Sequence, residues 1–267
     1  FQTENGKFVN VDTATDEGLK RASKLNLAKS GLADIITSSS PHPIANQIFT
    51  PNNPGRMFTI LRHPVDRAVT MYYYLKTATW DPLYNPKLIT MSLVDYAKSS
   101  SIENNWLTRF LVNKPGGALT KKDLILAKEL LKRKCLVGLY DDMEVSLAKF
   151  DRYFGWTDGN SIDQDGEDGD ENDSNDKDEE TNKKRRTAAK AAASSSSSLA
   201  KTTTKTEIQK CRKKVINTGD YRHNHPDVKE GSKEWNLIIQ QNRFDMELYN
   251  YAKLLYQVQG EQIFGIV

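Results

Sequence analysis

The sequence has few cysteines, little net charge and no long apolar run. Cys135 and Cys211 are its two cysteines, too few for a disulfide framework or a zinc site. They form either one bridge or two unrelated thiols. A formal net charge of +3 gives no argument for binding nucleic acid. No apolar stretch reaches the length that spans a membrane, and no signal-peptide pattern is present.

Hydrophobic residues are also scarce, at 37% of the chain, and one segment explains this low share. Residues 158–205 contain an acidic block, a basic run at 183–186 and tracts of Ala, Ser and Thr. This composition buries too little apolar surface to offset chain entropy, so we expect a disordered insertion. The basic run is typical of a nuclear address, a polyanion contact or a solvated loop. We expect 1–157 and 206–267 to form one domain.

Short apolar runs alternate with helix-like segments on both sides of the insertion. The runs predict strands at 33–37, 56–61 and 136–139. Alternation of strands and helices favours an α/β fold with a parallel sheet covered on both faces. Capping and amphipathic patterns predict the helices at 13–29, 64–79, 92–98, 104–112, 120–133, 141–155 and 234–258.

The most informative stretch is the end of the strand at 56–61. Arg62 stands at its carboxyl end. Pro64 suits the first position of a helix, where its missing N–H costs nothing. The free N–H groups and positive dipole end of that helix would point back toward Arg62. This arrangement predicts an anion site, most naturally for phosphate.

Residues 62–70 read Arg-His-Pro-Val-Asp-Arg-Ala-Val-Thr and are followed by three tyrosines. They resemble a phosphate-binding motif of the carbohydrate sulfotransferases, in particular the heparan sulfate and uronyl 2-O-sulfotransferase-like group. The family motif reads Arg-Asp-Pro-Val-Glu-Arg, then two or three residues, Ser and a tyrosine pair. The resemblance implies that Arg62 and Thr70 hold the 3′-phosphate of the donor, 3′-phosphoadenosine 5′-phosphosulfate. His63 replaces the family's Asp, and we expect it to contact the phosphate or to cap the turn.

The resemblance also implies a catalytic base. The family's base is a histidine in a Gly-His-x-Pro-like segment, which corresponds to His42 in Ser-Pro-His-Pro-Ile-Ala at 40–45. Loops at the carboxyl ends of neighbouring parallel strands converge, so a strand at 33–37 would bring His42 near Arg62. The alternative is a surface histidine in a proline-rich loop.

A polar loop at 217–226 corresponds to one that closes over the donor in relatives. The resemblance therefore implies that Tyr221 and Arg222 contact the phosphate or the adenine. His223 and His225 form a His-x-His pair, but no third ligand is evident and we expect no metal.

Acceptor recognition needs cations if the acceptor is an acidic glycan. Arg109 lies in Asn-Trp-Leu-Thr-Arg, which resembles a family segment near the acceptor cleft. Arg67 and Lys76 are further candidates. Each of the three is otherwise a solvated helix residue.

The resemblance implies a P-loop-NTPase-like parallel sheet flanked by helices, incomplete at its N-terminal side. In the family, a Lys-x-Gly-x-Ser/Thr loop binds the phosphosulfate, and no such loop precedes Arg62. We therefore expect this chain to carry only half of the donor site. We interpret 114–120 as a turn. The expected function is sulfuryl transfer to a glycan hydroxyl in the Golgi, by a parent protein anchored upstream. Two alternatives remain: a non-catalytic module that binds a nucleotide or sulfated glycan, and an insertion at 158–205 that tethers a protein partner.

Overall fold

The computed structural model describes residues 2–3, 6–7, 10–38, 41–156 and 225–265. They all belong to one of the two compact units into which the chain divides, formed by Phe1–Trp156 and His223–Val267. The insertion predicted at 158–205 lies outside the described residues. None of the described helices is both long and apolar enough to cross a membrane.

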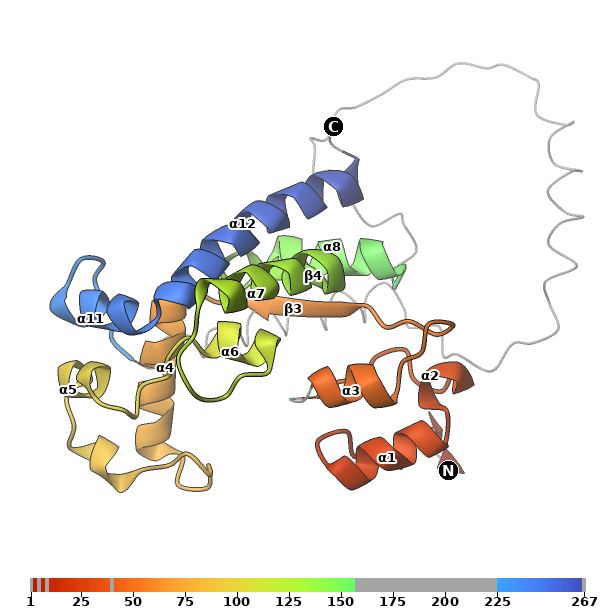
Figure 1. The fold of residues 1–267 in the computed structure, drawn as a ribbon, viewed down its shortest axis with the longest axis horizontal. Helices are drawn as coiled ribbons and strands as arrows, with labels where there is room; N and C mark the ends of the chain where they lie inside the picture. Colours follow the sequence, from red (N-terminus) through yellow and green to blue (C-terminus); the bar gives the residue numbers. More distant parts are fainter. Residues whose placement is uncertain (1, 4–5, 8–9, 39–40, 157–224, 266–267) are drawn as a thin grey trace, which may run out of the picture. The chain divides into compact units, whose positions relative to one another are not determined.

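Two parallel strands lie at the centre of this unit (Figure 1). β3 (Met57–Leu61) pairs with β4 (Cys135–Leu139), so that Phe58 lies opposite Leu136. Both segments are rich in apolar and β-branched residues, which favour strands. The two sequence predictions are confirmed, each with one end shifted by one residue. The helices packed on the pair are α7 (Lys121–Lys134), α8 (Met143–Phe154) and α12 (Arg243–Phe264).

Helices cover both faces of the two-stranded sheet, because alternate residues of a strand point to opposite sides. Cys135 and Val137 are fully buried on one side, in a cluster with residues of α7 and α12. Phe58 lies on the other side, with its ring centroid 5.1 Å from that of Phe150 in α8. Gly138 packs directly under Phe150, where a Cβ would come within 2.7 Å of the ring. The predicted α/β layering is therefore present on a small scale.

The strand predicted at 33–37 does not form, which corrects the sequence prediction. The Thr13 hydroxyl donates to the carbonyl of Thr37 at 2.6 Å, and the Ser38 hydroxyl donates to the carbonyl of Thr13 at 2.7 Å. These side-chain bonds take the place of a strand ladder. Ile35 is 48% exposed, so the apolar run lacks the burial that a central strand needs. Among the described residues, the only other strands are β1 (Gln2–Thr3) and β2 (Gly6–Lys7), an antiparallel pair.

Capping patterns fix the ends of several helices as predicted. The Ser92 hydroxyl accepts from the backbone N–H of Asp95 at 3.1 Å. Thr120 and Asp123 form a complete capping box. Other described helices are α1 (Asp16–Lys24), α2 (Leu27–Ser30), α3 (Pro41–Gln47), α4 (Pro64–Thr77), η1 (Pro86–Ile89), α5 (Leu93–Lys98), α6 (Trp106–Val112), η2 (Tyr140–Asp142) and α11 (Lys233–Gln241).

Two predicted helices are each divided in two, and asparagine lies at both breaks. The segment at 13–29 is interrupted at Asn26, which adopts a left-handed conformation with φ 50°. The segment at 234–258 is interrupted at Asn242, with φ −120° and ψ 34°. The Asn242 side chain accepts from the backbone N–H of Asn105 at 2.8 Å, so the break serves a contact between distant segments.

The helices α6 and α12 cap each other's N-termini, although they are 137 residues apart in sequence. The Asp245 carboxylate accepts from the backbone N–H groups of Leu107 and Thr108, both at 2.8 Å, and from the Thr108 hydroxyl at 2.6 Å. In return, the Asn105 side-chain oxygen accepts from the backbone N–H of Phe244 at 2.8 Å. This exchange joins the part of the domain before the insertion to the part after it.

Candidate functional site

Arg62 lies where the sequence predicted it, at the carboxyl end of β3 and directly before α4. Its guanidinium carbon lies 4.9 Å from the centroid of the Tyr140 ring, which follows β4. The ends of both parallel strands therefore help to place this cation. Among the described residues, no carboxylate or carbonyl accepts a hydrogen bond from Arg62. Within the described part of the chain, the guanidinium is positioned by an aromatic ring and its donors are available for an anion.

His63 caps the helix that follows Arg62. Its Nδ1 accepts from the backbone N–H of Val65 at 3.3 Å, which satisfies one of the free donors of α4. The ring stacks on Trp235 at 5.0 Å and meets the edge of Tyr249 at 5.4 Å. Burial lowers the pKa of His63 and favours the neutral ring. Of the two predicted roles, the structure shows the cap.

Thr70 lies further along α4 and contacts a histidine that follows the insertion. Its hydroxyl oxygen lies 3.0 Å from Nε2 of His225. The imidazole stacks almost parallel on Tyr73, with centroids 5.0 Å apart and 4° between the planes. The sequence indicated a polar loop near the donor, but not that His225 would reach Thr70. The only local signal for this contact was the His-Asn-His-Pro pattern.

Acidic residues lie close to the predicted anion site. Burial raises the pKa of Asp66, and the carboxylates of Asp141 and Asp227 raise it further, whereas Arg62 lowers it. Asp66 precedes Thr70 by four residues on α4, so both lie on one face of the helix. Asp66 and Thr70 thus lie on one side of α4, and Arg62 precedes the helix, although no hydrogen bond of the described residues joins Arg62 to Thr70. The site carries mixed charge and is less cationic than the motif predicted.

His42 lies in the short helix α3, where the sequence predicted a loop. Its Nε2 lies 3.2 Å from the backbone carbonyl oxygen of Phe110 in α6. A carbonyl only accepts, so Nε2 carries the hydrogen, and the lone pair of a neutral ring lies on Nδ1. No hydrogen bond or ring contact of the described residues joins His42 to Arg62 or Thr70. The absence of a strand at 33–37 removes the sheet geometry that was expected to bring them together.

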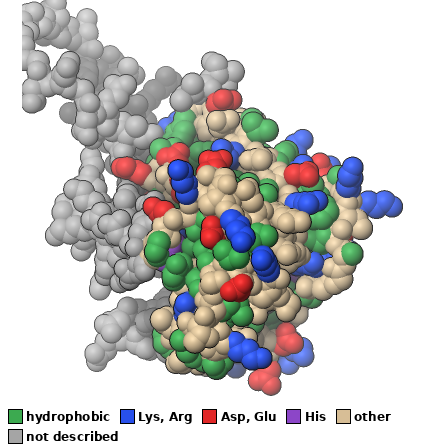
Figure 2. Space-filling view, turned by 90° about the vertical axis from the view of Figure 1, so that its left-hand side faces the viewer, with side chains coloured by type: hydrophobic (Ala, Val, Ile, Leu, Met, Phe, Trp, Pro, Cys, Tyr) green, Lys and Arg blue, Asp and Glu red, His purple; other side chains and the backbone are tan. Residues whose placement is uncertain are grey.

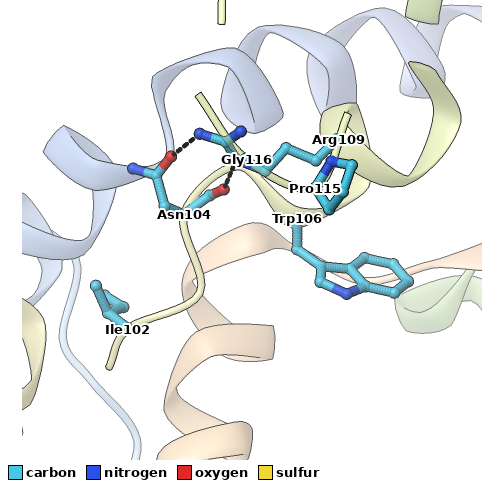
Figure 3. Close-up of a pocket in the computed structure, with 6 residues that line it drawn as sticks. All are labelled: Ile102, Asn104, Trp106, Arg109, Pro115 and Gly116. Carbon is cyan, nitrogen blue, oxygen red and sulfur yellow. Dashed lines mark hydrogen bonds between the residues drawn. The ribbon is translucent and has the colours of Figure 1, made fainter. Parts of the chain in front are cut away.

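Arg109 holds a turn in place. Its Nε and Nη2 donate to the backbone and side-chain oxygens of Asn104, at 2.9 and 3.0 Å. Its Nη1 donates to the carbonyls of Lys114 at 3.3 Å and Gly117 at 3.0 Å. Figure 3 shows the Arg109 side chain bonded to Asn104. Both residues border a cavity of about 360 Å³. The cavity is lined by Ile102, Asn104, Trp106, Arg109, Pro115 and Gly116, and neither Arg62 nor Thr70 borders it.

The other candidate acceptor cations also have partners within the fold. Arg67 donates to Glu103 at 2.8 Å and lies 3.7 Å from the centroid of the Trp106 ring. Lys76 donates to the hydroxyl of Tyr72 at 3.1 Å. On the face shown in Figure 2, Lys and Arg side chains are interspersed with Asp and Glu and form no continuous basic patch. Arg67 and Lys76 therefore already contact neighbouring side chains of the same chain.

Several predicted residues lie outside the described part of the chain, namely Tyr221, Arg222 and His223. Cys211 also lies outside it, while Cys135 is a buried free thiol whose pKa is raised by burial to about 12. Among the described residues, no group of three or more His, Cys, Asp or Glu is arranged to hold a metal ion.

No family model matches this chain, and no curated protein or solved structure matches it significantly. Function must therefore be inferred from the chemistry of Arg62, Thr70 and their neighbours. The strongest local feature is Arg62, which lies between the end of strand β3 and the start of helix α4.

Proposed function

We propose that this chain binds the 3′-phosphate of 3′-phosphoadenosine 5′-phosphosulfate and belongs to an enzyme that transfers the sulfuryl group to a glycan hydroxyl. The observation that carries the proposal is the position of Arg62 between the carboxyl end of β3 and the N-terminus of α4. We extend the proposal to an acidic glycan acceptor and to the Golgi lumen, which the family resemblance implies.

The physical support is the chemistry available to a phosphate beside Arg62. An arginine can donate two parallel hydrogen bonds to phosphate oxygens, each contributing about 1.5–3 kcal/mol. The N-terminus of α4 adds a positive dipole end, which favours negative charge. The Tyr140 ring limits the motion of the guanidinium and so reduces the entropy lost on binding. Together these features favour a phosphate over a neutral ligand.

In the proposed reaction, the acceptor oxygen attacks the donor sulfur and forms a new S–O bond. The bond between sulfur and the bridging oxygen breaks, and 3′-phosphoadenosine 5′-phosphate leaves with that electron pair. A base must take the acceptor's proton, and Nδ1 of His42 keeps the lone pair for this role. Arg62 and Thr70 would hold the nucleotide so that its sulfuryl group points at the acceptor.

A second candidate is a module that binds the nucleotide without catalysis. One observation favours it: His42 contacts Phe110 and has no described contact with Arg62 or Thr70. Incubation with donor and a heparan-type acceptor separates the candidates, because the enzyme releases 3′-phosphoadenosine 5′-phosphate and the module does not. Under the enzyme proposal, His42→Ala abolishes that release but leaves nucleotide affinity unchanged.

The binding proposal predicts a clear effect for Arg62→Ala. Calorimetric titration with 3′-phosphoadenosine 5′-phosphate should show affinity about 10–100-fold lower than wild type, because one charge-assisted contact to phosphate is lost. Arg56→Ala is the matched control. Arg56 precedes the other end of β3 and also lies over a tyrosine, 5.5 Å from the ring centroid of Tyr153. Equal affinities for wild type and Arg62→Ala would overturn the phosphate assignment.

Replacing Asp66 should change nucleotide affinity in the opposite direction to replacing Arg62. Asp66→Asn removes a negative charge beside Arg62, so we expect nucleotide affinity to rise about 2–10-fold at low ionic strength and to approach wild type in high salt. Glu17→Gln, in the first turn of the distant helix α1, controls for the loss of a first-turn carboxylate. Unchanged or weaker binding by Asp66→Asn at low salt contradicts this electrostatic account.

A further inference from the structure

The contact between Thr70 and His225 has a defined hydrogen-bond direction. Nδ1 of His225 lies 3.2 Å from the carbonyl oxygen of Pro226. A carbonyl oxygen has no hydrogen to give, so Nδ1 carries the proton in the neutral ring and Nε2 carries a lone pair. The Thr70 hydroxyl, 3.0 Å from Nε2, therefore donates its hydrogen to His225. In this state Thr70 has no hydrogen left for an anion.

A phosphate dianion can only accept hydrogen bonds, so binding at Thr70 must change this arrangement. The Thr70 hydrogen has to turn toward the phosphate, which leaves the hydroxyl oxygen facing the lone pair of Nε2. Two acceptors at hydrogen-bond distance repel each other. A proton on Nε2 removes the conflict, because the imidazolium donates to the Thr70 oxygen while Thr70 donates to the phosphate.

We propose that His225 is part of the phosphate site and takes up one proton when a phosphate monoester binds at Thr70. This inference rests on the proposed function, since it needs a phosphate at Thr70. It adds a positive charge beside the phosphate, in addition to the charge that Arg62 would supply. Imidazole is suited to the role because it changes charge between about pH 5 and 8.

Among the described residues, the groups around His225 are compatible with an imidazolium. From α4, Tyr73 stacks on the ring and Asp66 lies one turn from Thr70 on the same face. From its own segment, Asp227 is two residues away and interacts electrostatically with Asp66. Arg62 interacts electrostatically with the same Asp66 and is a cation of this region. The bound phosphate adds two negative charges, which favour the protonated ring further.

Titration calorimetry of the full chain with 3′-phosphoadenosine 5′-phosphate tests the proposal. Binding enthalpies measured at one pH in buffers of low and high ionisation enthalpy give the number of protons taken up. We expect wild type to take up as much as one proton more than His225→Gln, whose amide can donate to Thr70 without a proton. Affinity of the wild type should rise by up to about tenfold for each pH unit lowered, and less for the variant.

Two controls separate this inference from the proposed function. His42→Gln should keep the proton uptake of wild type, and adenosine 5′-monophosphate, which lacks a 3′-phosphate, should bind without the uptake that depends on His225. Equal uptake by wild type and His225→Gln overturns the role of His225 but leaves nucleotide binding intact. Absence of nucleotide binding to wild type overturns the proposed function as well. Thermal melting of each variant verifies that it is folded.

Discussion

Replacing Asp245 with alanine should lower the free energy of unfolding by about 3–5 kcal/mol, because three donors, two of them buried, lose their acceptor. Asp245 is 2% exposed. It accepts from the N-terminal N–H groups of α6 and from the Thr108 hydroxyl. Burial raises the pKa of this carboxyl, although the bonds from Thr108 and Leu107 act to lower it. These donors replace the water that the buried carboxyl has lost.

Urea denaturation followed by tryptophan fluorescence measures this effect. Asp245→Asn should lie between wild type and Asp245→Ala, since its oxygen replaces one acceptor while its NH₂ faces other donors. Glu247→Ala is the matched control, because Glu247 is an exposed carboxylate in the same helix. We expect its effect to stay within about 0.5 kcal/mol. A loss below 1 kcal/mol for Asp245→Ala would show that the caps between α6 and α12 contribute little to stability.

Sequence patterns predicted the features of this fold that depend on neighbouring residues. Thr120 and Asp123 mark a helix start because both halves of a capping box lie within four positions. The run at 33–37 has the same apolar character as a strand, but a strand also needs a partner and burial, which no local pattern encodes. The break at Asn242 likewise depends on Asn105, a residue far away in sequence.

The same distinction between local patterns and distant contacts applies to the candidate site. The place of Arg62 follows from a strand, a proline and a helix in direct succession, so the sequence was sufficient to predict it. The charge around it was not predictable, since Asp141 and Asp227 reach Asp66 only through the fold. The same holds for Arg109, whose donors are occupied by backbone carbonyls and Asn104. An amino-acid sequence alone shows which cationic residues exist but not which of them are paired within the fold.

Replacing Lys149 with methionine should make the stability of the protein less dependent on pH. Lys149 is fully buried, and its ammonium nitrogen donates to the backbone carbonyl of Tyr256 at 3.1 Å. The same nitrogen lies 3.3 Å from the centroid of the Tyr256 ring. Burial lowers the pKa of Lys149 from 10.5 to about 7, although Asp142 acts in the opposite direction. In the folded protein the neutral amine is therefore favoured above about pH 7.

The direction of the pH effect follows from proton counting. Between pH 7 and 10.5 the unfolded chain binds a proton at Lys149 that the folded chain lacks, so stability rises with pH. One group contributes a slope of at most about 1.4 kcal/mol per pH unit. Methionine fills a similar volume and carries no charge, so its advantage over wild type should be largest at pH 7 and below and should shrink toward pH 10.

Urea denaturation of both proteins between pH 6 and 10 gives this difference directly, since the other titrating groups are common to both and cancel. Lys122→Met, which replaces an exposed lysine by the same residue, is the matched control. A constant difference for Lys149→Met would mean that the buried amine stays charged in the folded state. The Tyr256 ring and Asp142 would then stabilise the ammonium as well as water does, and the contact between α8 and α12 would depend on a buried ion rather than on a neutral hydrogen bond.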